Sequence, residues 1–143
     1  MEAFTVHKVT AEIYALVQNL YAHQTQALDR GDFKRYVETF TEDAVFFHSP
    51  DAPPARTRAG ILAAAQAHAH AHKDDQVTKR HYYNQIALSP LSDGSVRATL
   101  YALVVRTRRG EKVPEIWPSC LLEDVLTIEN DVVLTRSRHI SYD

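Results

Sequence analysis

Apolar residues recur every three or four positions in the first part of the chain, as they do along one face of a helix. These positions are Ile13, Leu16, Val17, Leu20, Tyr21, Ala27 and Leu28. Thr10 precedes the run as a favourable N-cap, and Gly31 follows it as a favourable stop. The pattern therefore predicts a helix from about residue 11 to residue 30.

Shorter elements fill the stretch up to residue 72. Residues 33–40 keep the helical spacing, and residues 44–48 form a compact apolar run that predicts a short strand. Prolines at positions 50, 53 and 54 predict a loop after this strand. Residues 58–72 are rich in alanine and predict a third helix.

The second half of the chain changes to β-branched and aromatic runs separated by turn residues. Long strands are expected over residues 77–88, 96–108, 113–127 and 132–142. Because the connections between them are short, we expect an antiparallel meander. Pro114 and Pro118 lie in the third of these runs and predict either an edge strand or a bulge there.

Helices followed by a meander of strands predict one α+β domain over residues 1–143. Of the 143 residues, 45% are hydrophobic and 24% are charged, so the chain is large enough to bury a core of its own. The formal net charge is −2, and no basic block is present. This argues against nucleic acid as a partner, because phosphate binding needs clustered cations.

The cysteine count and the apolar runs bear on where the protein works. The single cysteine, Cys120, cannot form an internal disulfide, which suits a reducing cytoplasmic location. The N-terminus lacks the basic start and apolar run of a signal peptide, and no apolar stretch is long enough to cross a bilayer. We therefore expect a cytoplasmic protein without a membrane partner.

Four segments, in order, resemble the SnoaL-like, nuclear transport factor 2-like superfamily. Residues 20–33 resemble its opening helix, which ends in a leucine, an aspartate and a Gly-Asp-aromatic turn. Residues 40–45 resemble the start of its first strand, residues 80–84 its histidine-bearing second strand, and residues 138–143 its arginine-bearing last strand. The resemblance implies a cystatin-like cone, in which a bent antiparallel sheet wraps around the long N-terminal helix and two shorter helices.

The resemblance also implies functional residues. The scytalone dehydratase and hexachlorocyclohexane dehydrochlorinase families pair an aspartate at the end of the first helix with a histidine on the second long strand. Asp29 and His81 match these two positions, and His48 matches a pocket tyrosine of the scytalone enzymes. Arg106 stands where those enzymes carry a histidine, which is a departure from a strict dehydratase pattern.

A histidine beside a carboxylate is suited to proton transfer, because imidazole titrates near neutral pH and the carboxylate sets its tautomer. The residues alone leave two alternatives open. At about 100° per residue, Asp29 lies roughly 160° around the helix from Ile13, which would also fit a solvated helix end. His81 taken alone would also fit a hydrogen-bonded histidine within a sheet.

Strand alternation places the next candidate. Ala98, Leu100, Ala102 and Val104 share one face of their strand, and their apolar character marks it as the core face. Arg106 continues this face toward the end of the strand. It is expected either to reach the cone mouth and bind an enolate or carboxylate, or to lie on the surface.

Three further candidates lie on other strands. Tyr83 and Gln85 alternate with His81 and are expected to share its face. Trp117 is expected either to wall the pocket or to lie in a subunit interface.

The last strand carries two arginines. Arg136 and Arg138 alternate with Leu134 and Ile140, so the four are expected on one face. One arginine is expected to pair with a pocket acid or a substrate carbonyl, unless this strand is an exposed edge.

Histidines at positions 68, 70 and 72 lie in the alanine-rich helix. His68 and His72 are four residues apart and could share a metal ion. No carboxylate or third-ligand pattern accompanies them, so we expect no metal and no other cofactor.

These observations favour a cofactor-independent lyase, isomerase or cyclase of the dehydratase or polyketide cyclase type, acting on a small hydrophobic metabolite. Asp29 and His81 are the expected catalytic pair. The residues expected at the substrate are His48, Tyr83, Arg106, Trp117 and Arg138. The alternative is a non-catalytic binding or assembly subunit, similar to the small subunit of ring-hydroxylating dioxygenases.

A homodimer is also expected. Thr99, Tyr101, Leu103 and Val105 make the second face of their strand apolar. Because three helices can cover only one face of the sheet, this other face is expected to pack against a second copy.

Overall fold

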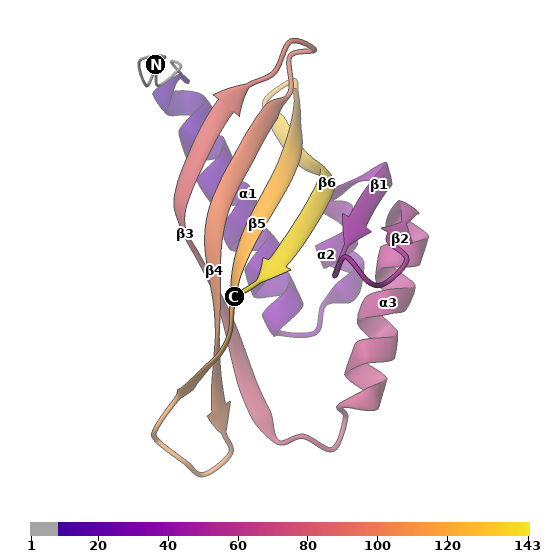
Figure 1. Cartoon of the computed structure of the whole chain (residues 1–143), viewed down its shortest axis with the longest axis vertical. Coiled ribbons are helices and arrows are strands. Elements are labelled where there is room, and N and C mark those ends of the chain that lie inside the picture. The colour runs from indigo at the N-terminus through magenta and orange to yellow at the C-terminus, as the bar shows by residue number, and fades with distance from the viewer. Residues whose placement is uncertain (1–8) are drawn as a thin grey trace.

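The computed structural model describes residues 9–143 (Figure 1). Its elements are α1 (Ala11–Asp29), α2 (Phe33–Glu38), β1 (Phe40–Phe47), β2 (Ala55–Arg56), α3 (Thr57–Ala71), β3 (Val77–Pro90), β4 (Val96–Arg108), β5 (Glu115–Glu129) and β6 (Val132–Tyr142). The predicted α+β class is confirmed. The N-terminal residues, where no signal peptide is expected, lie outside the described part of the chain.

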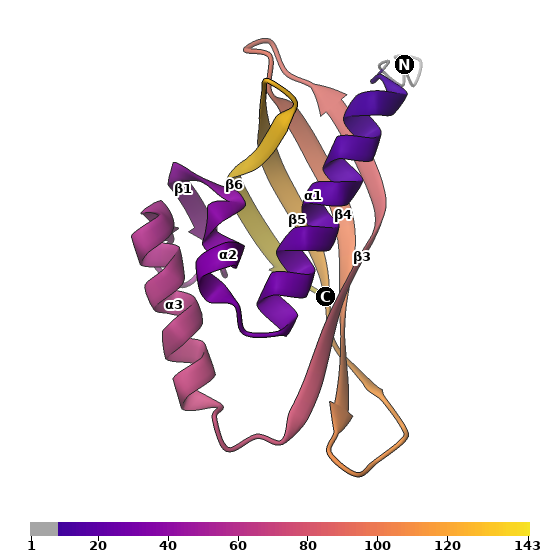
Figure 2. The same cartoon turned by 180° about the vertical axis from the view of Figure 1, so that it is seen from behind.

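One six-stranded sheet has the order β2-β1-β6-β5-β4-β3. Neighbouring strands are antiparallel except β1 and β6, which run parallel. All three helices lie on the same side of this sheet, and α1 crosses its long strands (Figures 1 and 2). Side chains of the core fill the region between α1 and the inner face of the sheet, which we call the wedge, and β3 is an edge strand beside α1.

The turn between α1 and α2 agrees with the caps expected from the sequence. The Thr10 hydroxyl accepts a hydrogen bond from the Ile13 N–H at 3.2 Å and begins α1. Gly31 adopts a positive φ of 77°, which glycine tolerates without strain. Asp32 then accepts a hydrogen bond from the Arg35 N–H at 3.3 Å and caps α2. This tight turn holds Asp29 in the last turn of α1.

Two boundaries differ from the prediction near the second helix. That helix ends at Glu38, because Phe40 is fully buried and already belongs to β1. The Phe40 ring packs edge-on against Tyr36 and stacks on Phe46, with centroids 5.2 Å and 6.1 Å away. The short strand β2, which the sequence pattern did not predict, pairs with β1.

Pro118 of β5 marks a bulge and not a sheet edge, and Pro114 lies just before the strand. β5 lies between β4 and β6, so the edge-strand alternative is wrong. Its register against β4 shifts between Leu103 and Val105, opposite the segment that contains Pro118. Proline is tolerated there because the ladder is already interrupted.

A bulge in β3 separates Gln85 from His81 and Tyr83, so the expectation that all three share one face is wrong. The register against β4 shifts between Asn84 and Ala87, and Gln85 has a φ of 51°. One extra residue reverses the alternation of side chains. Gln85 is therefore exposed, and Ile86 takes the inward position.

A bulge in β6 shows that the expectation for the last strand is wrong. The register of β6 against β5 shifts at Arg136, so Leu134 and Arg136 do not share the face of Arg138. Thr135 and Arg138 are buried on the inner side, whereas Arg136 forms an ion pair with Asp93 at 3.1 Å near the surface. The edge-strand alternative is also wrong, since β6 lies between β5 and β1.

The main core lies between α1 and the sheet. The predicted core face of β4 is confirmed, since Ala98, Leu100, Ala102 and Val104 are all buried. They face the apolar stripe of α1, whose buried members include Val17, Leu20 and Tyr21. A second cluster joins α2, β1 and α3 around Phe40 and Ile61.

A charged network is buried inside this core. The Arg138 guanidinium donates to both carboxylate oxygens of Asp124, at 2.9 Å and 2.8 Å, and to the Gln24 side-chain oxygen at 2.5 Å. The Tyr21 hydroxyl donates to Asp124 at 2.7 Å. Side chains of Arg138 and Asp124 are only 1% and 0% exposed. The network therefore ties α1 to β5 and β6 by contacts that water does not weaken.

The contacts within this network determine the protonation of Arg138 and Tyr21. Burial alone disfavours the guanidinium, but the adjacent Asp124 outweighs it, and the pKa of Arg138 rises well above its usual value. Burial, followed by the Asp124 charge, raises the pKa of Tyr21. At neutral pH the Arg138 guanidinium therefore keeps its charge, and the Tyr21 hydroxyl keeps its proton.

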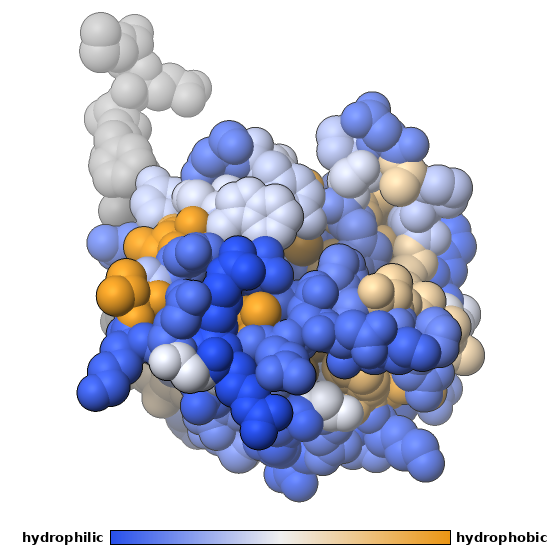
Figure 3. All heavy atoms as spheres, turned by 90° about the horizontal axis from the view of Figure 1, so that it is seen from below, coloured by the Kyte–Doolittle hydropathy of each residue, from blue (hydrophilic) through white to orange (hydrophobic). Residues whose placement is uncertain are grey.

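The surface also bears on where ligands can bind. The end of the molecule that carries the β4–β5 hairpin is mostly hydrophilic, with a few hydrophobic residues among the polar ones (Figure 3). Within residues 9–143, none of the helices is both long and apolar enough to span a membrane.

The buried pair predicts a large stability difference between two arginines of one strand. Arg138→Gln leaves Asp124 buried without its countercharge, and we expect it to lower the free energy of unfolding by about 3–5 kcal/mol. Arg136→Gln, the matched control on β6, removes only a surface ion pair and should barely move the denaturation midpoint. Urea denaturation followed by circular dichroism measures both, and equal midpoints would contradict a stabilising role for the network.

Candidate active site

The carboxylate of Asp29 bridges the end of α1 and the edge strand β3. Its Oδ1 lies 2.5 Å from the Nδ1 of His81, and its Oδ2 accepts a hydrogen bond from the His81 backbone N–H at 3.0 Å. The Asp29 side chain is 6% exposed, so the alternative of a solvated helix end is wrong. The His81 side chain is 21% exposed and can still reach a ligand.

The position of His81 in the sheet explains this contact. Because β3 is an edge strand, every second backbone N–H points away from β4 and needs another partner. The N–H of His81 finds that partner in Asp29. A single carboxylate thus completes the backbone hydrogen bonding of the edge and also fixes the imidazole ring.

This arrangement defines the protonation of the neutral imidazole. A carboxylate at Nδ1 favours the tautomer with hydrogen on Nδ1, which leaves Nε2 as the proton acceptor. The same carboxylate stabilises the imidazolium once Nε2 has taken a proton. The pair can therefore take a proton from one atom and return it to another.

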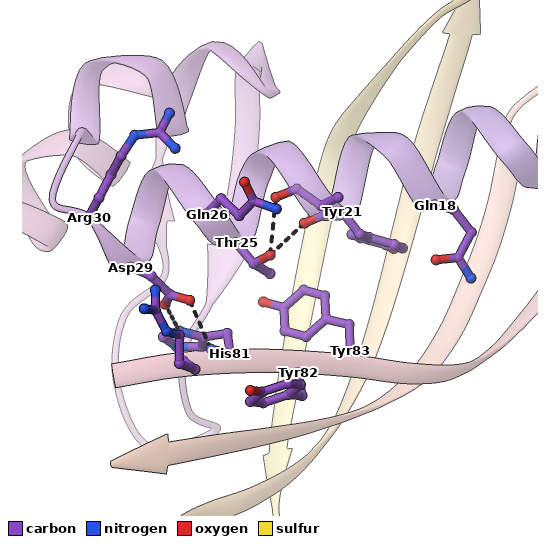
Figure 4. A pocket seen from close by; sticks show the side chains of 11 residues that line it. Gln18, Tyr21, Thr25, Gln26, Asp29, Arg30, His81, Tyr82 and Tyr83 are labelled. Carbon is purple, nitrogen blue, oxygen red and sulfur yellow. Dashed lines mark hydrogen bonds and ion pairs between the residues drawn. The ribbon is translucent and has the colours of Figure 1, made fainter. Parts of the chain in front are cut away.

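A groove of about 510 Å³ runs along this pair between α1 and β3. From α1 it is lined by side chains that include Gln18, Tyr21 and Gln26 (Figure 4). On β3, Tyr83 points toward α1, and Tyr82 points to the opposite side of the strand (Figure 4). The groove has the volume expected for a small-molecule site.

Tyr83 and Arg138, both predicted at the substrate, lie behind the histidine in the same wedge. The Tyr83 ring packs edge-on against Tyr21 at 5.5 Å, and its hydroxyl accepts a hydrogen bond from Arg138 at 3.4 Å. Burial raises the pKa of Tyr83, so its hydroxyl stays protonated near neutral pH. The Arg138 guanidinium donates its hydrogen bonds to Asp124, Gln24 and the Tyr83 hydroxyl. Arg138 can therefore influence a ligand in the groove through Tyr83.

His48 lies across the wedge, just after the end of β1. Its ring stacks on Phe46, with centroids 3.9 Å apart. Partial burial, and then the positive charge of Arg138, lower the pKa of His48. A neutral imidazole at this place can donate or accept a hydrogen bond, but no contact joins it directly to His81.

Arg106 and Trp117 lie together near the β4–β5 hairpin. The guanidinium carbon of Arg106 is 5.2 Å from the centroid of the Trp117 ring, a cation–π distance. Trp117 is 65% exposed, so it packs on Arg106 at the rim of the wedge and does not wall the groove beside His81.

The sequence reasoning missed the inner partners of Arg138. Asp124 follows the exposed Glu123, but it alternates with Leu122 and Leu126 and is the acid that falls on the buried face of β5. A lone carboxylate on a core face needs a cation, and that signal was present in the sequence. Gln24 carries no comparable signal, since a polar residue on a helix is usually solvated.

His68 and His70 lie in α3, and His72 is its C-cap. Rings of His68 and His72 lie 4.5 Å apart, but within residues 9–143 no group of three potential metal ligands comes together. His72 instead contacts Asp75 at 2.9 Å on the surface.

Comparison with known proteins identifies relatives over nearly the full length. The SnoaL-like domain model matches residues 9–139. ActVI-ORFA from Streptomyces coelicolor is 45% identical, with 92% of this chain and 97% of that chain covered and a TM-score of 0.85. A protein from Catenulispora acidiphila in complex with S-DNPA is 37% identical, with 94% and 96% covered and a TM-score of 0.80.

A more distant structure bears on the fold alone. A nuclear transport factor 2-like protein with a cystatin-like fold, from Novosphingobium aromaticivorans, is 18% identical and has a TM-score of 0.74, with 90% of this chain and 80% of that chain covered. No match to this chain is found among curated proteins. The cystatin-like cone implied by the sequence resemblance is confirmed, and the match over residues 9–139 shows that this chain belongs to the SnoaL-like domain family.

Proposed function

We propose that this protein is a cofactor-independent lyase, isomerase or cyclase that moves a proton within a small metabolite bound in the groove. His81 acts as the general acid and base, and Asp29 positions it. The observation that carries the proposal is the double contact of Asp29 with the ring and the backbone of His81. This contact leaves Nε2 of His81 as the free, basic nitrogen.

The proposed chemistry begins with one proton transfer. Nε2 of His81 takes a proton from a carbon next to a substrate carbonyl, and the electrons of that C–H bond form an enolate. In an elimination, the imidazolium then gives the proton to a departing hydroxyl, which leaves as water. In an isomerisation it protonates another carbon, and in a cyclisation the enolate carbon attacks a second carbonyl, whose oxygen takes the proton.

The enolate oxygen needs hydrogen-bond donors. Tyr83 keeps its proton and receives a hydrogen bond from Arg138, which makes its hydroxyl a better donor. His48 is the other predicted donor to this oxygen, and Arg106 is the predicted partner of a carboxylate group of the substrate. Donors of this kind stabilise developing negative charge more strongly in a site that excludes water.

The relatives support a small-molecule substrate. A 37% identical relative is a complex with S-DNPA, and a groove of about 510 Å³ is present here beside the proposed catalytic pair. The tyrosines that line the groove offer apolar ring faces together with polar hydroxyls. We propose a small, predominantly hydrophobic metabolite as the substrate.

Replacement of the histidine tests the proposed base. The probe is 2-tetralone, an apolar ketone whose C–H bonds next to the carbonyl exchange with deuterium from the solvent. We expect His81→Ala to reduce the catalysed exchange rate by roughly 10²–10⁴-fold, because a positioned base is lost. NMR spectroscopy in D₂O measures the exchange.

Two further variants make that experiment specific. Asp29→Asn should reduce the rate while leaving the fold intact, because the imidazolium loses its countercharge. His23→Ala, on the exposed face of α1, is the matched control and should exchange at the wild-type rate. Wild-type exchange in His81→Ala would refute the base assignment. Binding of 2-tetralone without any catalysed exchange would favour the alternative of a non-catalytic binding subunit.

We also propose that the protein is a homodimer that pairs the uncovered faces of two sheets. All three helices lie on the other face, and aromatic side chains on this face are largely exposed (Figure 1). Tyr82 on β3 is 53% exposed, and Tyr101 on β4 is 57% exposed. Leu103 pairs with Tyr82 in register, so the apolar surface is continuous across the two strands.

A charge on this face tests the dimer. We expect Tyr101→Asp to convert the protein from a dimer to a monomer, because it would bury two carboxylates at a symmetric interface. Val132→Asp, at the exposed β5–β6 turn, is the control and should leave the mass unchanged. Size-exclusion chromatography with light scattering measures both, and a monomeric wild type would contradict the proposal.

A further inference from the structure

Two cations that face each other across neighbouring strands lie on the inner side of the sheet. Lys79 of β3 is the register partner of Arg106 of β4. Both are half-buried and on the inward-facing side of their strands, with His81 next along β3 and Val104 next along β4. Like charges directly opposite in a sheet repel one another, so the pair destabilises the fold unless an anion joins it.

Neither cation has an acidic partner within the part of the chain that the structure describes. Ion pairs within 4.0 Å involve other residues, and the Nε of Arg106 is buried without a hydrogen-bond partner. The Trp117 ring packs on the guanidinium, whose carbon lies 5.2 Å from the ring centroid. An unsatisfied buried donor is rare in folded proteins and needs an explanation.

A third group approaches from α3. The Nε2 of His68 lies 3.5 Å from the Nζ of Lys79. Partial burial, followed by the charge of Lys79, lowers the pKa of His68, so its imidazole is neutral near pH 7. Partial burial, and then Arg106, lower the pKa of Lys79 as well. The three side chains thus form a cluster that repels further positive charge.

The carboxylates around the cluster have other partners. Asp75 contacts His72 at 2.9 Å, Glu115 lies 3.9 Å from the Arg108 guanidinium, and Asp29 is held by His81. Asp74, Asp75, Glu111 and Glu115 line a pocket at the base of the hairpin that Arg106 also lines, and Glu115 is the register partner of Arg106 on β5. Within residues 9–143, however, none of these carboxylates lies within 4.0 Å of Lys79 or Arg106, so both cations can still bind an anionic ligand.

The spacing relates this cluster to the catalytic pair. Lys79 precedes His81 by two residues on the same face of β3, which corresponds to about 7 Å along the strand. A substrate whose reacting carbon lies beside His81 would place a substituent, and not that carbon, beside Lys79 and Arg106. That substituent must be anionic to relieve the repulsion.

We propose that Lys79 and Arg106 form a binding subsite for a carboxylate of the substrate, with His68 next to Lys79. The inference rests on the proposed function, and it narrows the substrate class to carboxylic acids with an apolar body. The guanidinium donates from its unpartnered Nε–H and the ammonium donates one N–H, while Trp117 keeps the guanidinium oriented. A bound anion offsets the repulsion between the two cations, so binding of the carboxylate also removes this destabilisation of the fold.

A pair of probes with the same shape tests the charge requirement. We expect the wild type to bind 2-naphthoate about tenfold more tightly than the neutral 2-naphthamide, because charged hydrogen bonds contribute more than neutral ones. In Lys79→Gln and in Arg106→Gln this preference should fall to about twofold or less. Isothermal titration calorimetry of the full chain measures the affinity of each of the three proteins for both probes, and added salt should reduce the preference.

Control variants separate the subsite from net charge and from misfolding. Arg97→Gln removes one positive charge from an exposed position of the same strand β4 and should keep the wild-type preference. Lys79→Gln should not lower the thermal midpoint, because it removes a repulsion. A wild-type preference below twofold, or an undiminished preference in Lys79→Gln, would overturn the subsite.

The test is independent of catalysis. The subsite predicts that His81→Ala keeps the preference for 2-naphthoate, since neither cation depends on that ring for its position. If His81→Ala instead retained 2-tetralone exchange, the proposed base would fail while the carboxylate preference stood. Loss of the preference in the wild type would remove the subsite and leave the proposed base in place.

Discussion

The contact of Asp29 with His81 is the constraint on which the candidate site depends. A helix end and an edge strand, separated by 51 intervening positions of the chain, are joined by one carboxylate that uses both oxygens. One oxygen holds the backbone of the strand and the other holds the ring. The orientation of the imidazole, which is one of the side chains that line the groove, is thereby fixed by the main chain as well as by a side chain.

This contact depends in turn on the buried network deeper in the wedge. Arg138, Asp124, Gln24 and Tyr21 fix the rotation of α1 about its axis through hydrogen bonds in the absence of water. With that rotation set, the final turn of α1 directs Asp29 at β3. Two acid–base pairs thus serve different purposes, a fully buried pair for architecture and a partly exposed pair whose imidazole can exchange protons.

The distribution of positive charge adds a second level of organisation. The charge of Arg138 is balanced by Asp124 inside the core, whereas no acidic group within residues 9–143 lies within 4.0 Å of Lys79 or Arg106. Folded proteins usually avoid cations that face each other in this way, and the sites that contain them are commonly functional. The inner side of the sheet therefore combines the proposed base, hydrogen-bond donors and these two cations, all of which would favour a substrate that carries or develops negative charge.

The sequence by itself determined the class of fold and most of its elements, because periodicity and turn residues are local properties. The caps of α1 and α2 and the core face of β4 could be predicted from neighbouring residues alone. The resemblance supplied the pairing of Asp29 with His81, which periodicity left open. Tertiary structure alone decided the faces of Gln85 and Arg136, since single-residue bulges reverse alternation without a strong local signal. It also decided the partners of Arg138 and the isolation of Lys79 and Arg106, because contacts between distant strands depend on register and burial that no short segment encodes.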